Sequence, residues 1–162
     1  MIRLAKLKDI DEILAVYETA RNFMRVTGNP TQWNGGYPQK EILIEDINKE
    51  QLYVLDIDDE IHGVFAFIKG IDPTYNYIEN GNWFSDSEYY AVHRVASAGK
   101  SKGVLKTCLD YCKGYKLNLR IDTHSDNRVM QHLLIKNGFI KCGTIYLANG
   151  DPRIAFEFIN KQ

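Results

Sequence analysis

The sequence predicts a layered α/β domain built on a mixed β-sheet, and three observations lead to this prediction. Strand-like and helix-like segments alternate in the later part of the chain, which is typical of layered α/β domains. Two pairs of strand-like segments are joined by short turns, which is typical of antiparallel hairpins. The 162 residues are 44% hydrophobic, which is enough for one full core. We therefore expect a single domain over residues 1–162.

The first third of the chain is expected to form one short strand and two helices. Residues 1–7 can form an edge strand, and residues 9–20 have the pattern of a helix. Asp9 and Glu12 have the spacing of a capping box at its start. Its apolar residues recur at helical spacing: Ile10, Ile13, Leu14 and Tyr17. After a loop rich in Gly, Pro and Asn, residues 41–50 are expected to form the second helix.

The rest of the chain is expected to supply six strands and two further helices. The strands are expected over residues 52–57, 61–69, 89–97, 117–123, 139–147 and 153–159. The helices carry apolar stripes and are expected over residues 103–113 and 126–137. Gly138 has the position of a left-handed residue that ends the last helix. Residues 28–40 and 70–87 have the composition of loops.

Charge and cysteine content restrict the partners and the compartment. The formal net charge is −1, so no overall basic field exists to hold a nucleic acid or an anionic membrane. No apolar run approaches the roughly 20 residues that cross a bilayer, and no signal peptide is expected at the start. Three cysteines, with Cys108 and Cys112 four apart in one expected helix, favour reduced thiols. We expect a cytoplasmic protein with no nucleic-acid or membrane partner.

The stretch SAGKSKGVLK, residues 97–106, lies between an expected strand and an expected helix. It combines two glycines with Lys100, Ser101 and Lys102. Such a turn presents free backbone N–H groups, and the helix dipole adds positive charge, so a di- or triphosphate suits it. A solvated basic turn that only caps the helix is the alternative. A nucleotide P-loop is not indicated, because Arg94 stands where that motif needs a glycine.

Two motifs in the second half of the chain carry a resemblance to a known family. The first is the run Lys100-Ser101-Lys102-Gly103-Val104-Leu105, and the second is Asn127, a helix, and then Lys136-Asn137-Gly138-Phe139. In their spacing and element order they resemble the GNAT family of acetyl-CoA-dependent N-acyltransferases. The resemblance covers most of the chain and is strongest over residues 89–158. Lys100 stands where the family usually has Arg or Gln, and Leu105 replaces a glycine or alanine.

The resemblance implies a three-layer fold and a cofactor. In the family a mixed sheet of six to seven strands is flanked by about four helices, and the fourth and fifth strands, here residues 89–97 and 117–123, splay apart. The pantetheine arm of acetyl-CoA adds to the open strand edge. The backbone N–H of Val95 would also stabilise the oxyanion of the reaction. Carried over to this sequence, the cofactor-binding residues are Val95, Ala96, Lys100, Ser101, Lys102, Gly103, Val104 and Asn127.

Two residues near the fourth strand are candidates for the general base that an attacking amine needs. Glu88 lies at the start of the strand, and His93 lies within it and has the better intrinsic pKa. The alternatives are an exposed loop charge for Glu88 and a packed strand residue for His93. At the position of Leu134 the family often has a Tyr that acts as the general acid. Tyr146, His132 or solvent would then protonate the leaving thiolate.

Asp122, His124 and Asp126 lie between an expected strand and the following helix. Their side chains are of metal-ligand types. Ligands at one strand end rarely close a coordination shell without others, so we expect no metal site. Ser125 or Asp126 can instead cap the helix. The resemblance gives Asn127 the cofactor-facing position, and the neighbouring residues would border the cofactor slot.

Trp33 and Tyr37 are the candidates for binding the acceptor substrate, because their rings offer apolar faces with a polar tip. The alternative is that Trp33 fills the core under its loop. The expected activity is direct transfer of an acetyl group from acetyl-CoA to a primary amine of a small molecule or peptide. A noncatalytic acyl-CoA-binding module and a nucleotide-binding regulatory domain are the alternatives, and Leu134 favours the first of them. Homodimers are common in the family.

Overall fold

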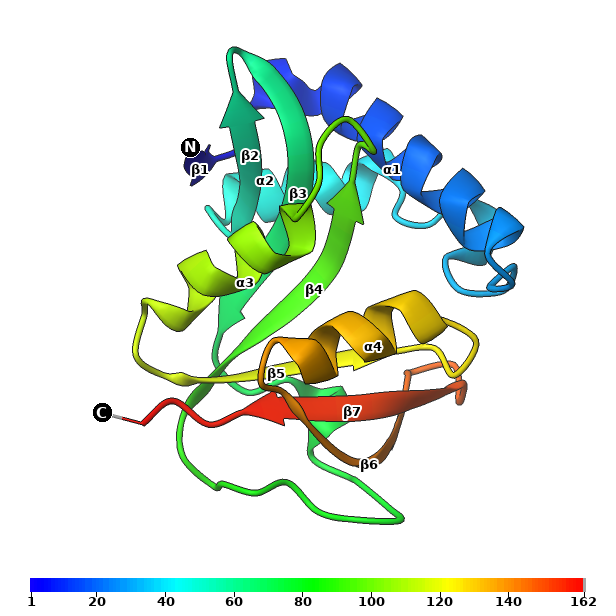
Figure 1. Cartoon of the computed structure of the whole chain (residues 1–162), viewed down its shortest axis with the longest axis vertical. Coiled ribbons are helices and arrows are strands. Elements are labelled where there is room, and N and C mark those ends of the chain that lie inside the picture. Colours follow the sequence, from blue (N-terminus) through cyan, green and yellow to red (C-terminus); the bar gives the residue numbers. More distant parts are fainter. Residues whose placement is uncertain (162) are drawn as a thin grey trace.

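The computed structural model describes residues 1–161 and contains one seven-stranded sheet with the strand order β1-β2-β3-β4-β5-β7-β6 (Figure 1). Strands β4 and β5 pair in parallel, and the other neighbouring strands pair antiparallel. The strands are β1 (Ile2–Leu4), β2 (Leu52–Ile57), β3 (Glu60–Lys69), β4 (Tyr89–Ser97), β5 (Asn118–Thr123), β6 (Ile140–Tyr146) and β7 (Pro152–Phe158). The helices are α1 (Ile10–Val26), α2 (Lys40–Asn48), α3 (Val104–Lys113) and α4 (Arg128–Lys136). None of these helices has the length and apolar character needed to cross a membrane.

The helices cover both faces of the sheet, which confirms the expected three layers. Helices α1 and α2 pack on one face, where Tyr17 and Leu43 join a core with residues of β2, β3 and β4. Helices α3 and α4 pack on the other face, where Leu109 and Leu134 join a second core. The loop over residues 70–88 covers the first face beside β5, β6 and β7 through a third cluster. Every layer thus buries an apolar stripe, as the sequence pattern requires.

Strands β4 and β5 separate soon after they begin. They pair only where Tyr89, Tyr90 and Ala91 lie opposite Asn118, Leu119 and Arg120. From residue 92 onward β4 has no described strand on its β5 side, and the two strands diverge visibly (Figure 1). The expected splay between the fourth and fifth strands is therefore present. It leaves an unpaired strand edge in the middle of the sheet.

A β-bulge lies in β4 beside this opening. The register with β3 shifts so that Arg94 and Val95 both lie opposite Phe65. Arg94 has a φ of 54°, a left-handed conformation that a non-glycine residue adopts only when its surroundings hold it. The Tyr17 hydroxyl donates to the Arg94 carbonyl at 2.6 Å, and the Asp46 carboxylate accepts from the Arg94 guanidinium at 2.9 and 3.0 Å. Helices α1 and α2 therefore fix the bulge.

Local starts and stops of the helices were only partly predicted. The expected capping box is wrong, because the Asp9 carboxylate binds Arg3 and the Lys6 N–H while Glu12 accepts from the Ile61 N–H. Helix α4 is capped by Asn127, not by Ser125 or Asp126, and the Asn127 side chain accepts from the Met130 N–H at 3.0 Å. Gly138 has a φ of 89°, which confirms the left-handed stop after α4.

Candidate active site

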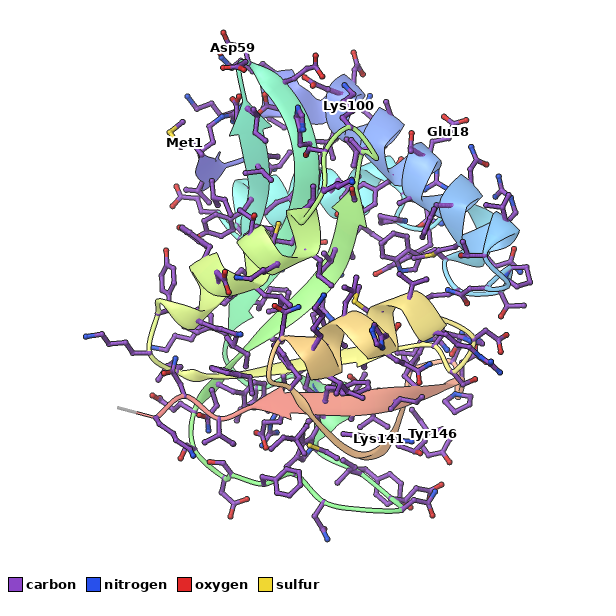
Figure 2. All side chains as sticks on the ribbon, in the orientation of Figure 1. Met1, Glu18, Asp59, Lys100, Lys141 and Tyr146 are labelled. Carbon is purple, nitrogen blue, oxygen red and sulfur yellow. The ribbon has the colours of Figure 1, made fainter. Side chains whose placement is uncertain are left out.

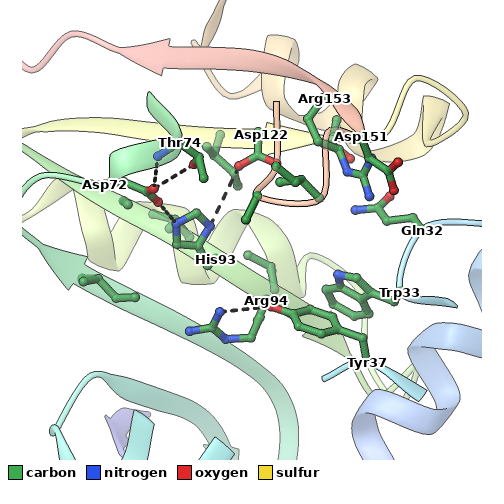
Figure 3. A pocket seen from close by; sticks show the side chains of 18 of the residues that line it. Gln32, Trp33, Tyr37, Asp72, Thr74, His93, Arg94, Asp122, Asp151 and Arg153 are labelled. Carbon is green, nitrogen blue, oxygen red and sulfur yellow. Dashed lines mark hydrogen bonds and ion pairs between the residues drawn. The ribbon is translucent and has the colours of Figure 1, made fainter. Parts of the chain in front are cut away.

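A cavity of about 750 Å³ opens where β4 and β5 separate (Figure 3). Its wall combines the centre of β4, the end of β5, the loop after α1, the start of the β3–β4 loop and the β6–β7 turn. These segments are distant in sequence, and the splay of the sheet brings them together. The lining residues lie within the ranges 31–37, 70–74, 91–95, 121–123 and 147–153, with Met24, Ile68 and Met130 behind them.

His93 projects from β4 into this cavity and contacts two carboxylates. Its Nε2 lies 2.7 Å from Asp72 Oδ2, which is a hydrogen bond, and its Nδ1 lies 3.9 Å from Asp122 Oδ1. An ionised carboxylate can only accept, so this contact assigns the Nε2 proton to His93 and leaves Nδ1 facing Asp122. The distance of 3.9 Å is too long for a direct hydrogen bond, so Nδ1 has no direct hydrogen-bond partner among the described residues. The imidazole is thus oriented from one side and accessible from the other.

The two carboxylates are themselves held in place. The Tyr75 hydroxyl donates to Asp122 Oδ1 at 2.6 Å, and burial together with the Asp122 charge raises the pKa of Tyr75 well above its usual value. Asp72 Oδ1 accepts from the N–H and the hydroxyl of Thr74 at 2.9 and 2.7 Å. Burial opposes ionisation of Asp72, but the hydrogen bonds from His93 and Thr74 outweigh it and lower its pKa to about 2. Hydrogen bonds therefore fix both carboxylates beside the His93 ring.

The expected acceptor residues lie on the loop after α1 and line the cavity. Trp33 has a φ of 58° and packs edge-on against Tyr17, with ring centroids 5.5 Å apart. Trp33 therefore both contacts the core and faces the cavity. The Tyr37 hydroxyl accepts from Arg94 Nη1 at 3.2 Å, which ties the loop to the β4 bulge. The structure thus brings these residues to the same cavity as His93 and Val95.

The residues at the β5–α4 junction have separate partners. His124 Nε2 lies 3.0 Å from the Thr31 hydroxyl, and its Nδ1 accepts from the Asp126 N–H. Asn127 Nδ2 donates to Gln32 Oε1 at 3.1 Å, in addition to the cap that its side-chain oxygen provides. Within residues 1–161 no group of three His, Cys, Asp or Glu side chains has an arrangement that could hold a metal ion. The junction thus connects the loop after α1 to the start of α4.

The expected phosphate loop lies between β4 and α3, outside the cavity lining. Gly99 and Gly103 both have a φ of 73°, the left-handed conformation in which glycine is unstrained. Lys100 Nζ pairs with Glu60 at 3.0 Å, and the Ser101 hydroxyl lies 2.8 Å from His62 Nδ1. Those two side chains are thus already engaged. Lys102 is exposed, while Ala96 and Val104 at the two ends of the loop are buried.

Two of the catalytic candidates lie elsewhere. Glu88 is exposed just before β4 and does not line the cavity. Tyr146 lies on the β6 edge, far from Lys100, and its hydroxyl donates to Glu79 (Figure 2). Leu134, at the position of the family's usual acid, is fully buried and offers no proton donor. Of the three candidates, the structure brings only His93 to the cavity.

Sequence reasoning missed several polar residues of the cavity. Asp72 and Thr74 line the cavity from a loop that the sequence marked only as polar and aromatic, and Arg153 follows a turn. Tyr75, buried in the same loop, supports the cavity through its hydrogen bond to Asp122. The run Asp72-Pro73-Thr74 has the form of a helix cap, with Pro at the first helical position, and could have indicated an ordered turn. No local signal marks Arg153, because its surroundings arise from the pairing of β5 with β7.

Of three comparisons with known proteins, the one with solved structures gives matches. A scan against protein-family models gives no match, and neither does a search among curated proteins. Among solved structures, a GNAT-family acetyltransferase from Streptococcus agalactiae 2603 is 33% identical, with a TM-score of 0.91. The match covers 100% of this chain and 96% of that one.

Other solved structures are more distant. A provisionally named acetyltransferase from Staphylococcus aureus Mu50 is 26% identical, with a TM-score of 0.74 and 99% coverage of both chains. A GNAT-family acetyltransferase from Listeria monocytogenes 4b F2365 has a TM-score of 0.72 at 15% identity and shows the fold alone; the match covers 97% of this chain and 92% of that one. The similarity to the streptococcal and staphylococcal proteins supports acyl transfer as the general chemistry of this protein. On its 33% identity and TM-score of 0.91 to the streptococcal protein along the whole chain, the protein belongs to the GNAT family of acetyltransferases.

Proposed function

We propose that the protein transfers an acetyl group from acetyl-CoA to a primary amine of a small molecule or peptide. The observation that carries this proposal is the position of His93, which Asp72 orients at the cavity wall where β4 leaves β5. A base in this position faces both the open strand edge and the acceptor side of the cavity. Asp122, on the other side of the ring, adds negative charge that attracts a cationic amine.

Several features of the chain fit acetyl-CoA. The loop before α3 is glycine-containing, leads into a helix N-terminus and carries the exposed Lys102, which suits a pyrophosphate. A Cβ placed on Gly103 would meet nothing within 4 Å, so the loop has open space around it. The unpaired edge of β4 at Val95 and Ala96 can bond an amide-containing arm, and Asn127, at the start of α4, would bond the arm from the other side. When bound there, acetyl-CoA supplies the acetyl thioester.

The residues of the chain would then act on the amine. The amine would bind beside His93 Nδ1 and Asp122 as an ammonium ion and lose one proton to solvent, which gives the nucleophilic free amine. His93 would take the second proton as the N–C bond forms. The N–H of Val95 would stabilise the charge that develops on the acyl oxygen. The C–S bond breaks as the amide forms, and solvent would protonate the thiolate, because neither Leu134 nor Tyr146 offers a donor in the cavity.

Direct attack is favoured over a covalent acyl-enzyme. The three cysteines are Cys108, Cys112 and Cys142, and all of them are buried. Burial raises the pKa of the Cys108 thiol to about 12, which leaves little thiolate to act as a nucleophile. None of the three lines the cavity. Positioning of amine and thioester, with one base, is therefore the proposed source of catalysis.

The proposal is tested by measuring thiol release from acetyl-CoA over a panel of primary amines. His93→Gln should lower kcat/KM by about 10²- to 10⁴-fold, the range for removing a general base. The loss should shrink at high pH, where the free amine is abundant. His132→Gln is the matched control, because His132 is exposed on α4 and does not line the cavity. Equal rates for the His93 and His132 variants would contradict the role of His93.

Ligand binding separates the proposal from its alternatives. Stabilisation against heat by acetyl-CoA without turnover of any amine would identify a noncatalytic acyl-CoA-binding module. Stabilisation by ATP in preference to CoA would identify a nucleotide-binding domain, and would leave the acyltransferase proposal without support. Stabilisation by acetyl-CoA together with turnover of at least one amine is the expected result.

A further inference from the structure

Arg153 lies on β7 at the wall of the cavity, and its surroundings are unusual for a buried arginine. The residue is only 9% exposed. Its Nη1 donates to the Pro152 carbonyl at 2.8 Å, and no carboxylate of residues 1–161 lies within 4.0 Å of its guanidinium. Arg153 lines the cavity, and its guanidinium nitrogens are not among the fully buried polar atoms that lack a partner.

The other deeply placed arginines have acidic partners. Arg120, which is 7% exposed, pairs with Glu157 at 3.0 Å and lies against the ring of Trp83. Arg94 also lines the cavity, but both oxygens of Asp46 bind it. These two arginines are structural. Arg153 alone among the three presents an uncompensated positive charge to the cavity.

An arginine in this state has no counter-charge within 4.0 Å in the folded protein. Burial of a charge without a counter-charge disfavours folding, so such groups are normally paired. The planar guanidinium matches a carboxylate, which it can bind through two parallel hydrogen bonds. A carboxylate of the substrate would therefore satisfy Arg153 in a way that no residue of the chain does.

The position of Arg153 relative to the proposed base sets the shape of such a substrate. Asp122 lies opposite Ala155 in the β5–β7 pairing, so Asp122 and Arg153 project from the same face of the sheet. Diagonal neighbours of this kind have Cα atoms roughly 7–8 Å apart. Figure 3 shows Asp72 and His93 at one end of the cavity, Arg153 at the other, and Asp122 between them. The cavity thus has Asp72 and His93 toward one end and Arg153, beside Asp151, toward the other.

One further charged residue borders Arg153. Asp151 lies at the β6–β7 turn, is exposed and lines the cavity. Its carboxylate accepts from Asn149 Nδ2 at 3.2 Å and does not pair with Arg153. Gln32, which extends toward the same end, is neutral and bonds Asn29 and Asn127. Neither residue makes a hydrogen bond to the guanidinium or an ion pair with it within 4.0 Å.

We infer that the acceptor is an amine that also carries a carboxylate, and that Arg153 binds this carboxylate while the amine lies at His93 and Asp122. The inference rests on the proposed function for the identity of the reacting amine. It adds a substrate class, namely free amino acids and related amino-carboxylates. An amine that lacks the acid group, or has it as an ester, leaves Arg153 without a partner.

The test compares matched pairs of amines that differ only in the carboxylate. Amino acids with α- and ω-carboxylates are measured beside their methyl esters and their decarboxylated amines, on wild type and Arg153→Gln. Wild type should prefer the free acid, and Arg153→Gln should lower kcat/KM for it by roughly 10- to 100-fold, as for a hydrogen bond to a charged group. The loss should appear mainly in KM. The ester and the plain amine should change by less than about threefold.

Two controls separate binding from folding and from overall charge. Lys141→Gln removes one positive charge from the exposed side of β6, outside the cavity, and should leave the preference intact. Arg153→Met should melt at or above the wild-type temperature, because it removes an unpaired buried charge. Arg120→Met should melt about 10 °C lower, because it leaves Glu157 buried and unpaired. A large fall in melting temperature for Arg153→Met would show a structural arginine and overturn the inference.

The outcomes distinguish this inference from the proposed function. Turnover of plain amines and esters as fast as the free acids would overturn the inference and leave acetyl transfer standing. If no amine is acetylated, binding decides: the free acids should still raise the melting temperature of wild type but not of Arg153→Gln. Equal melting shifts for the two proteins, or none with any acid, would overturn the inference as well.

Discussion

At the scale of single residues, Asp72 links the chemistry of the cavity to the stability of the fold. Its carboxylate holds His93 on one side and the turn at Thr74 on the other. Its pKa is lowered from 3.8 to about 2, so the folded protein favours the ionised form more than the unfolded chain does. A group of this kind stabilises the fold above its unfolded pKa and loses that contribution as the pH falls toward the folded pKa.

Asp72→Asn should therefore destabilise the protein at pH 7 by about 1 kcal/mol. This figure lies well below the full conversion of the shift, because the carboxyl is only partly buried. The difference in unfolding free energy between variant and wild type should shrink between about pH 4 and pH 2, where Asp72 protonates in both states. Urea unfolding at several pH values measures this. Asp86→Asn, an exposed change in the same loop, should show no such trend, and a constant gap for Asp72→Asn would contradict the assignment.

The sequence predicted single residues where a local pattern marked them. His93 was expected because a titratable ring stood in a strand beside an expected cofactor slot, and Trp33 and Tyr37 because aromatic rings stood in a polar loop. Asp72 and Arg153 were not predicted, because their roles depend on contacts between segments tens of residues apart. Such contacts are set by strand register, which composition and spacing do not reveal.

At the scale of elements, the start of α4 combines a structural role with the proposed cofactor role. The Asn127 oxygen caps the helix, while its amide nitrogen donates to Gln32, a residue of the cavity lining. The two roles use different atoms of one side chain. Variants that remove one atom at a time can therefore separate them.

Asn127→Asp should keep the cap and lose the amide donor, whereas Asn127→Ala should lose both. The Ala variant should lose about 1 kcal/mol of stability, as is usual for a removed N-cap, and the Asp variant should remain near wild type. Saturating acetyl-CoA, at a hundredfold excess over Kd, should stabilise wild type by about 2.7 kcal/mol and both variants by less. Thermal unfolding with and without acetyl-CoA gives the result. If acetyl-CoA stabilises the Asp variant as much as it stabilises wild type, the amide nitrogen of Asn127 does not bind the cofactor and the side chain serves only as the N-cap of α4.

Element boundaries were predicted more reliably than the interactions at their ends. The fourth strand was predicted over residues 89–97 and observed there, since alternating β-branched and aromatic residues define it. The capping box at Asp9 and Glu12 failed because Arg3 and the Lys6 N–H bind the Asp9 carboxylate, and the Ile61 N–H, 49 residues away in sequence, binds the Glu12 carboxylate. Local cap signals therefore compete with tertiary contacts, and sequence alone does not show which prevails.

At the scale of the whole molecule, the order of elements and the resemblance together predicted the layers and the splayed sheet. The bulge at Arg94 was not predicted, because it arises from the fit of β4 against β3, α1 and α2. The bulge and the splay act together: one turns the backbone at Val95, and the other leaves that edge without a neighbouring strand. A ligand that completes this edge would join the two halves of the sheet.

Hydrogen exchange tests that coupling across the molecule. Acetyl-CoA should slow amide exchange in the unpaired part of β4, in the loop before α3 and in the first turn of α4, because these segments would face the ligand. The slowing should reach about tenfold or more at saturation, a coupling of about 1.4 kcal/mol. The β1–β2 pair, on the far edge of the sheet, should change little and serves as the internal control. Protection confined to the loop before α3 would indicate phosphate binding without insertion at β4, and would count against the proposed position of the thioester.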